Sequence, residues 1–143
     1  MGTAEKLLKL VLYATGVVCG SAVVALFMPR SWMAWGHAQL GMGAFPEQGV
    51  AEYLARETSG LYAFYGILLL FLAQDVRRYA PLIAYQALAI AGVSIVATIY
   101  GGMPAYWLAA DTAGACAAAV ATLALQAAVR SADRRKAALA GAA

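Results

Sequence analysis

The stretch from Leu82 to Tyr100 reads LIAYQALAIAGVSIVATIY and contains no charged residue. Its apolar residues occupy every face of a helix instead of one stripe, which is typical of a helix surrounded by lipid. A helix rises about 1.5 Å per residue, so about 20 apolar residues cross the roughly 30 Å hydrocarbon core of a bilayer. The stretch therefore predicts a transmembrane helix.

Three further segments are also long and largely apolar, and together the four predict an all-α integral membrane four-helix bundle. We place the helices at residues 7–28, 56–75, 82–100 and 105–129. The composition agrees, because 64% of the 143 residues are hydrophobic and only 12% are charged, whereas about a quarter of a soluble domain is charged. We expect a single multi-pass domain over residues 1–143.

The first segment also has some features of a secretory signal peptide, because Lys6 and Lys9 stand at the start of an apolar run. The run is longer than a signal sequence needs, and it carries no clear small-x-small cleavage site before Pro29. We therefore predict a retained membrane helix.

Most basic residues fall into three groups, which lie at the start, after the second segment and after the fourth: Lys6, Lys9, Arg77, Arg78, Arg130, Arg134, Arg135 and Lys136. Four crossings put all three groups on one side of the membrane. The positive-inside rule assigns that side, and with it both termini, to the cytoplasm. The net charge of +3 thus reflects topology, and the lipid bilayer, not nucleic acid, is the expected partner.

The outer connection between the first two helices, residues 30–56, is longer than two antiparallel helices require. It contains Trp32, Trp35 and Phe45 and is too apolar for a free loop. We expect it to lie in the membrane interface or to fold back over the bundle.

One acidic residue, Asp111, falls inside a predicted span, about 10 Å below the outer end of the fourth helix. A carboxylate at that depth is costly unless it is neutral, paired or hydrated, so it should face the bundle interior. Residues at similar depth would form a polar network or ligand-binding mouth with it: Glu57, Arg56, His37, Tyr100, Trp107 and Tyr62. A simple interhelical hydrogen bond that locks the bundle is the alternative.

Motifs for catalysis or cofactor binding are absent from the sequence. It has one histidine and two isolated cysteines, Cys19 and Cys116, which form no metal or redox spacing. Phosphate-binding glycine loops and nucleophile elbows are also missing. We therefore assign no catalytic residue, metal or cofactor.

Several short strings resemble a family of small bacterial four-helix membrane proteins: Tyr53–Tyr62 (YLARETSGLY), Asp75–Tyr79 (DVRRY), Gly102-Met103-Pro104, Trp32-Met33 and the segment His37–Pro46. The overall plan is also similar to DoxX-like membrane proteins. The resemblance covers residues 25–112 and implies a bacterial cytoplasmic (inner) membrane, with no particular activity. This chain has Asp111-Thr112 where the family tends to carry a Glu-Gly pair.

The interpretation that fits these features best is a non-catalytic multi-pass protein. It would bind a lipid or quinone-like molecule, or act as an accessory subunit of a membrane complex, with a membrane-protein partner or as a homo-oligomer. A membrane enzyme with an outer-leaflet acid-base site at Asp111 or Glu57 is the first alternative. A small oligomeric transporter is the second.

Overall fold

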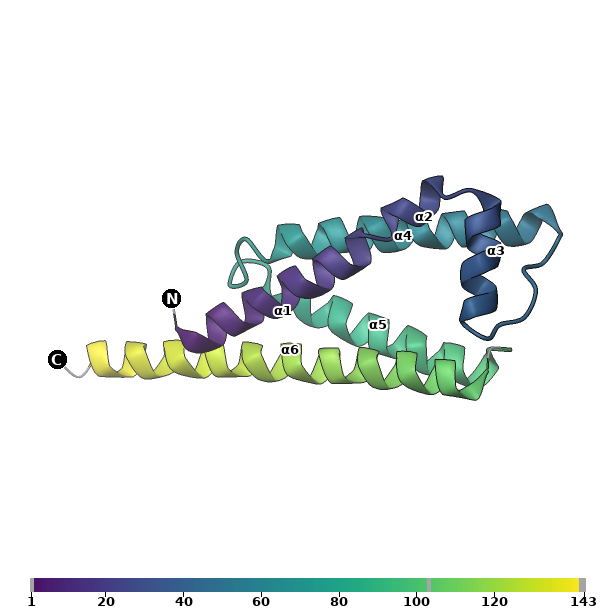
Figure 1. Ribbon diagram of the computed structural model, residues 1–143. Coiled ribbons are helices and arrows are strands. Elements are labelled where there is room, and N and C mark those ends of the chain that lie inside the picture. The colour runs from purple at the N-terminus through teal and green to yellow at the C-terminus, as the bar shows by residue number, and fades with distance from the viewer. Residues whose placement is uncertain (1, 103, 142–143) are drawn as a thin grey trace. The chain divides into compact units, whose positions relative to one another are not determined.

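The computed structural model describes residues 2–102 and 104–141, and every regular element in them is an α-helix. The helices are α1 (Thr3–Gly20), α2 (Val23–Phe27), α3 (Arg30–Gln39), α4 (Gly49–Leu72), α5 (Ala80–Tyr100) and α6 (Ala105–Ala140) (Figure 1). Met103 of the Gly-Met-Pro string and both ends of the expected 1–143 domain lie outside the described residues.

The chain forms two compact units. Met1–Leu12 and Leu72–Ala143 make the first, which we call the hairpin unit, and Tyr13–Phe71 make the second, the connection unit. Helix α1 thus begins in the hairpin unit and ends in the connection unit.

Three stretches in the described residues are long and apolar enough to cross a membrane: Thr3–Phe27, Ala80–Tyr100 and Ala105–Ala140. The predicted all-helical fold with membrane-spanning helices is confirmed to this extent. Helix α4 covers most of the predicted span at residues 56–75, but its first half carries Glu52, Arg56 and Glu57 and is less apolar.

Proline residues mark the helix starts as the sequence indicates. Pro29 and Pro104 are the N-caps of α3 and α6, and Pro81 lies in the first turn of α5. Proline is tolerated there because the first-turn N–H groups have no partner within the helix.

The first predicted span is not one continuous helix. Between α1 and α2, the N–H groups of Ala22, Val24 and Ala25 each bond the carbonyl three residues earlier, a tightened turn of the 3₁₀ type. The Ser21 hydroxyl donates to the Val18 carbonyl at 2.7 Å. A Gly-Ser pair at Gly20-Ser21 is a common cause of such a break.

In the hairpin unit, α5 and α6 pack side by side (Figure 1). Their contact is made of small buried residues, Ala87, Ala91 and Ala119, with Cys116 packed against them. Small side chains let the two backbones approach closely, which is how helices gain dispersion contacts in lipid. Helix α6 continues well past the predicted end of the fourth span, to Ala140.

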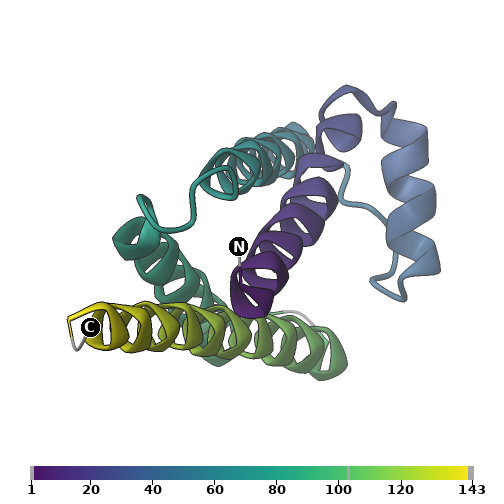
Figure 2. The same ribbon diagram turned by 90° about the vertical axis from the view of Figure 1, so that its left-hand side faces the viewer.

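In the connection unit, α1 and α4 cross at glycines. A Cβ atom at Gly66 would lie 2.2 Å from the backbone nitrogen of Gly20 and 2.6 Å from the carbonyl oxygen of Gly16. The crossing therefore has room only for glycine at this point. Figure 2 shows α3 standing crosswise to α4.

Candidate ligand-binding hollow

Aromatic and methionine side chains of the connection unit line one wide, open hollow, which we call the aromatic hollow; Trp32 and Trp35 in this lining are 63% and 68% exposed. Its volume is 960 Å³, at the upper end of the usual range for small-molecule sites, about 300–1,000 Å³. Its lining comes from α2, α3, the α3–α4 loop and one residue of α4: Ala25, Met28, Ser31, Trp32, Met33, Trp35, Gly36, His37, Leu40, Met42 and Ser59.

The far wall of the hollow is set by a chain reversal after α3. Gly41 and Gly43 have φ values of 71° and 81°, which residues with a side chain rarely adopt. His37 Nδ1 lies 3.1 Å from the Gly43 carbonyl oxygen. Because a carbonyl can only accept, Nδ1 carries the proton, and Nε2 is the acceptor of the neutral ring.

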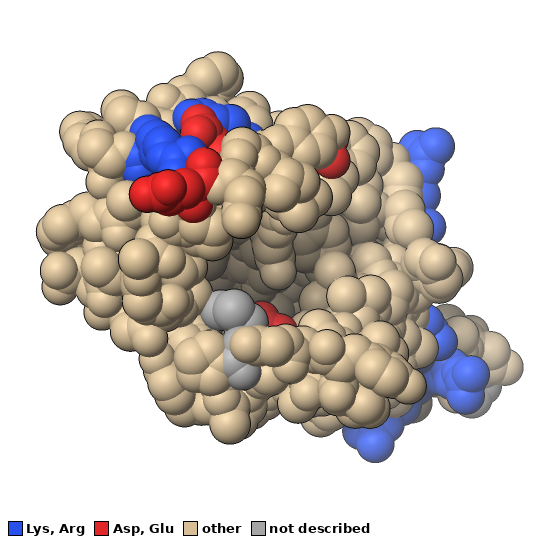
Figure 3. All heavy atoms as spheres, turned by 90° about the vertical axis from the view of Figure 1, so that its right-hand side faces the viewer, with Lys and Arg blue, Asp and Glu red and all other residues tan. Residues whose placement is uncertain are grey.

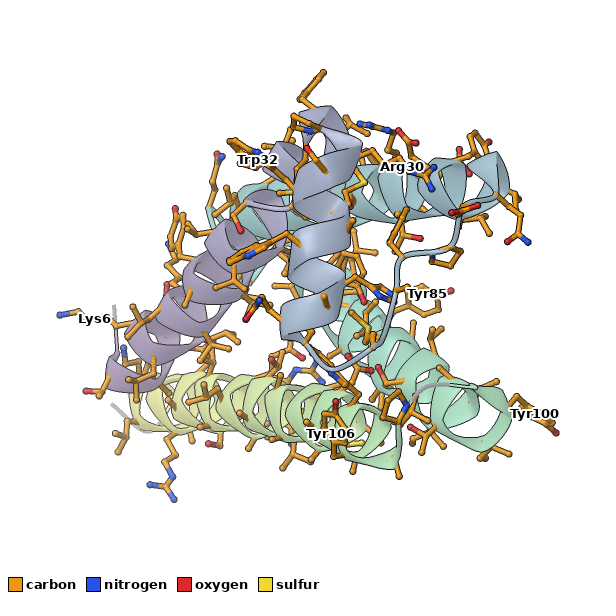
Figure 4. The ribbon with its side chains drawn as sticks, turned by 45° about the vertical axis from the view of Figure 1, so that its right-hand side comes forward. Lys6, Arg30, Trp32, Tyr85, Tyr100 and Tyr106 are labelled. Atoms are coloured by element: carbon orange, nitrogen blue, oxygen red, sulfur yellow. The ribbon has the colours of Figure 1, made fainter. Side chains whose placement is uncertain are left out.

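Phe45 holds the same loop against the start of α3. Its ring lies 5.5 Å from the His37 ring in an edge-on arrangement and 5.5 Å below the Arg30 guanidinium. Arg30 also donates to the Pro46 carbonyl at 2.9 Å. Figure 4 labels Arg30 and Trp32 at this end of α3. The loop is therefore folded back along α3.

Arg56 fastens the end of α2 to α4. Its guanidinium donates to the Leu26 carbonyl at 2.6 Å and to the Met28 carbonyl at 3.0 Å. These carbonyls lie where α2 ends, so no following helical turn can supply their donors. Arg56 thereby fixes Met28, a residue of the hollow's wall, and its role here is structural.

Glu52 forms ion pairs with both arginines, Arg30 and Arg56. It accepts from Arg56 at 2.7 Å, and its other carboxylate oxygen lies 3.6 Å from Arg30. The Arg56 hydrogen bond is the main reason why the pKa of Glu52 lies below its ordinary value. Figure 3 shows acidic and basic side chains meeting in one patch on a largely uncharged face.

Polar groups in the lining of the aromatic hollow are few, and they come from Ser31, His37 and Ser59. The Ser59 hydroxyl donates to the Ala55 carbonyl at 2.8 Å, so its oxygen is left to accept. A mostly apolar lining with a few polar groups is typical of sites for apolar molecules that carry one or two oxygen atoms.

Glu57 and Tyr62, two other predicted site residues, lie on α4 outside the lining of this hollow. Glu57 accepts a hydrogen bond from Tyr53, one turn earlier, and its charge is the main reason why the pKa of Tyr53 is raised. Tyr62 is 48% exposed. Of the seven predicted residues, His37 lines the hollow and Arg56 supports its wall.

Asp111, Tyr100 and Trp107 belong to the hairpin unit. Asp111 is exposed, and among the described residues no side chain forms an ion pair with it. Tyr100 projects from the end of α5 (Figure 4) and is 83% exposed, while the Trp107 ring lies 6.5 Å from that of Tyr106. Convergence of all seven residues, which are divided between the two units, stays a prediction.

Two polar clusters of the hairpin unit were not predicted. At one end, the hydroxyls of Thr98 and Thr112 lie within hydrogen-bond distance of each other and of the Ser94 carbonyl oxygen, so their two protons serve two of these three contacts. Near the other end, Arg77 pairs with Glu5 at 3.0 Å and with Asp133 at 2.6 Å. The first cluster could have been predicted from the sequence, because Thr98 and Thr112 are hydroxyl residues inside otherwise apolar helices.

Comparison with models of known families, with curated protein sequences and with solved structures found no match to this chain. The site is therefore interpreted from its own geometry.

Proposed function

We propose that this chain is a non-catalytic multi-pass membrane protein that binds a lipid or quinone-like molecule in the aromatic hollow. The observation that carries the proposal is the 960 Å³ hollow itself, lined by two tryptophans and three methionines with three polar residues among them. Methionine and aromatic side chains adapt to apolar ligands, and the polar groups would orient a ligand's oxygen atoms.

The lining is also chemically matched to a carbonyl- or hydroxyl-bearing head. The Ser31 hydroxyl is available as a donor, while the Ser59 oxygen and Nε2 of His37 are acceptors. The lining contains no carboxylate, lysine or arginine, so a strongly charged ligand would be poorly solvated there. These properties favour a neutral, largely apolar molecule.

We further propose four membrane crossings, with both termini in the cytoplasm. The ion pairs of Arg77 with Glu5 and Asp133 support this topology, because they bring the N-terminal end, the α4–α5 turn and the C-terminal part of α6 together. These three segments lie on the same side of the membrane if an even number of crossings separates each segment from the next. All three segments carry the basic residues expected inside.

The α4 helix would be the second crossing. Its large apolar side chains Leu61, Phe64, Ile67 and Phe71 are 50–67% exposed and follow one another at intervals of three or four residues. Such spacing puts them on one helix face, which suits contact with lipid tails. The resemblance to small bacterial four-helix proteins supports a bacterial inner membrane as the location.

Gly36 offers a direct test of the hollow. It lines the cavity, and a Cβ added there meets no atom within 4 Å, so Gly36→Phe should fill space without a clash. Gly92 on α5 is equally open and serves as the matched control. The protein is extracted from its native membrane in mild detergent, and co-purifying small molecules are identified by mass spectrometry.

We expect wild-type protein and Gly92→Phe to retain the same apolar molecule, and Gly36→Phe to lose most of it. Equal retention in Gly36→Phe would contradict binding in the hollow. Absence of any stoichiometric small molecule from the wild type would contradict the proposed function as a whole.

A second candidate function is association with another membrane protein or with further copies of this chain. The observation that favours it is the exposed Asp111 carboxylate, which lies within a helix long enough to span the membrane. A charge at that depth needs a polar partner. We expect Asp111→Asn to weaken a complex seen by size-exclusion chromatography in mild detergent, and an unchanged elution profile would argue against this role.

A further inference from the structure

A second hollow lies in the hairpin unit, on the surface shared by α5 and the C-terminal part of α6. Its volume is 300 Å³. One side of its lining is apolar and the other is basic: Ala84, Leu123, Gln126, Ala127, Arg130, Ser131 and Arg134. We call it the basic groove.

The length of α6 puts the basic groove at the level of lipid headgroups. The helix has 36 residues, or about 54 Å, which exceeds the roughly 30 Å of the hydrocarbon core. About 20 residues from Ala105 reach the region of Leu125, so Leu123 would lie at the level of the acyl chains. Arg130 and Arg134 lie one and two turns further, at the membrane surface.

The charge of the groove is positive and uncompensated. Arg130 and Arg134 are four residues apart and therefore share one face of α6. No acidic residue lines the groove, and among the described residues neither arginine forms an ion pair. The nearby Asp133 is committed elsewhere, to Arg77 at 2.6 Å.

Gln126, which lines the groove, carries a buried acceptor without a donor among the described residues. Gln126 is only 4% exposed, and its amide nitrogen donates to the Ala80 carbonyl at 2.9 Å. That bond fixes the orientation of the amide, since a carbonyl can only accept. The opposite atom, Oε1, has no hydrogen-bond partner within residues 2–102 and 104–141, although buried polar atoms normally have one.

We propose that the basic groove binds the phosphate group of an anionic phospholipid, for which phosphatidylglycerol is the test lipid. The phosphodiester would lie between Arg130 and Arg134, because guanidinium groups bind phosphate oxygens in pairs. An acyl chain would follow Leu123 and Ala127. Basic pockets between transmembrane helices on the cytoplasmic side are a general means of binding anionic lipids.

This site is separate from the aromatic hollow and stands whether or not that hollow binds its ligand. The test uses the full chain in detergent micelles, titrated with dioleoyl phosphatidylglycerol or dioleoyl phosphatidylcholine and observed by native mass spectrometry. The test variant is Arg130→Gln with Arg134→Gln. The control, Arg135→Gln with Lys136→Gln, removes the same charge from the same helix at residues that do not line the groove.

We expect wild-type protein to bind phosphatidylglycerol in preference to phosphatidylcholine. The Arg130/Arg134 variant should bind it about 25-fold more weakly, because each basic residue near an anionic headgroup contributes about fivefold. The Arg135/Lys136 control should bind it as the wild type does. Equal losses in the two double variants would overturn the proposal, because they would indicate general attraction to a basic tail.

A third variant tests the groove without changing charge. Ala127 is exposed and lines the groove, so Ala127→Phe should obstruct the path of the acyl chain and weaken lipid binding. An unchanged affinity of Ala127→Phe for the lipid would overturn the proposed binding site. Full displacement of the lipid by millimolar glycerol phosphate would also overturn it, since that result would assign the site to a soluble phosphate ester.

Discussion

The glycine crossing of α1 and α4 predicts that Gly66→Ala destabilises the protein, although alanine is the better helix former. The added Cβ would lie 2.2, 2.6 and 2.7 Å from Gly20 N, Gly16 O and Gly20 Cα. All three are backbone atoms, so no side-chain rotation relieves the overlap. The two helices would have to separate by more than about 1 Å to restore normal contact distances.

The size of the effect follows from that separation. A gap of about 1 Å forfeits up to about half of the dispersion energy of each contact, and overpacking typically costs about 1–3 kcal/mol. Alanine regains about 1 kcal/mol through helix propensity. All three contacts are with backbone atoms, so the upper half of the overpacking range applies, about 2–3 kcal/mol, and we expect a net loss of about 1–2 kcal/mol in the free energy of unfolding.

The assay is thermal unfolding in mild detergent, followed by circular dichroism and compared with Gly92→Ala. At Gly92 an added Cβ meets no atom within 4 Å, so propensity alone acts and the midpoint should stay equal or rise. If Gly66→Ala unfolds at or above the temperature of Gly92→Ala, the close crossing of α1 and α4 is refuted.

Three further predictions concern the ion pairs. The pKa of Glu52 is lowered from its ordinary 4.5. Ionised Glu52 therefore stabilises the fold above pH 4.5, and this stabilisation is lost as the pH falls through the lowered pKa. Glu52→Gln should make the thermal unfolding midpoint less dependent on pH between pH 7 and pH 3. Arg56→Met should cost about 1–2 kcal/mol of unfolding free energy through its carbonyl bonds, whereas Arg78→Met, which only loses a surface contact with Tyr79, should cost less than about 0.5 kcal/mol. The side chain of Arg77 is 47% exposed, but that of its partner Glu5 is only 10% exposed. Arg77→Gln should therefore lower the midpoint of thermal unfolding, because it leaves a nearly buried carboxylate without its partner, and the loss should change little in 0.5 M salt. A midpoint equal to that of the wild type would contradict this pairing.

The coarse fold could be predicted because membrane-spanning helices leave a strong local signal. The uncharged run from Leu82 to Tyr100 coincides with α5, and Pro104 marks the start of α6 at Ala105. Both features act within a few residues of sequence. The break after Gly20 and the continuation of α6 to Ala140 were less predictable, because each depends on a balance of weak preferences over a single turn.

The site was only partly predictable, because its parts are distant in sequence. Arg56 bonds the carbonyls of Leu26 and Met28 across about 30 residues, and backbone carbonyls carry no sequence signal. His37, one of the predicted site residues, lines the hollow, and its role in binding stays a prediction. Trp32 and Trp35 were interpreted as interfacial anchors, because a stripe of aromatic residues looks the same whether it faces lipid or lines a hollow.

Ligand binding in the aromatic hollow is tested most directly by tryptophan fluorescence. The chain has three tryptophans, and Trp107→Phe leaves only Trp32 and Trp35, both of which line the hollow. This variant in nanodiscs is titrated with a short-chain quinone and, separately, with a brominated phospholipid, each with and without Gly36→Phe. We predict saturable quenching by at least one of the two probes, and its loss when Gly36→Phe fills the hollow. Linear quenching by both probes, unchanged by Gly36→Phe, would contradict the proposed site.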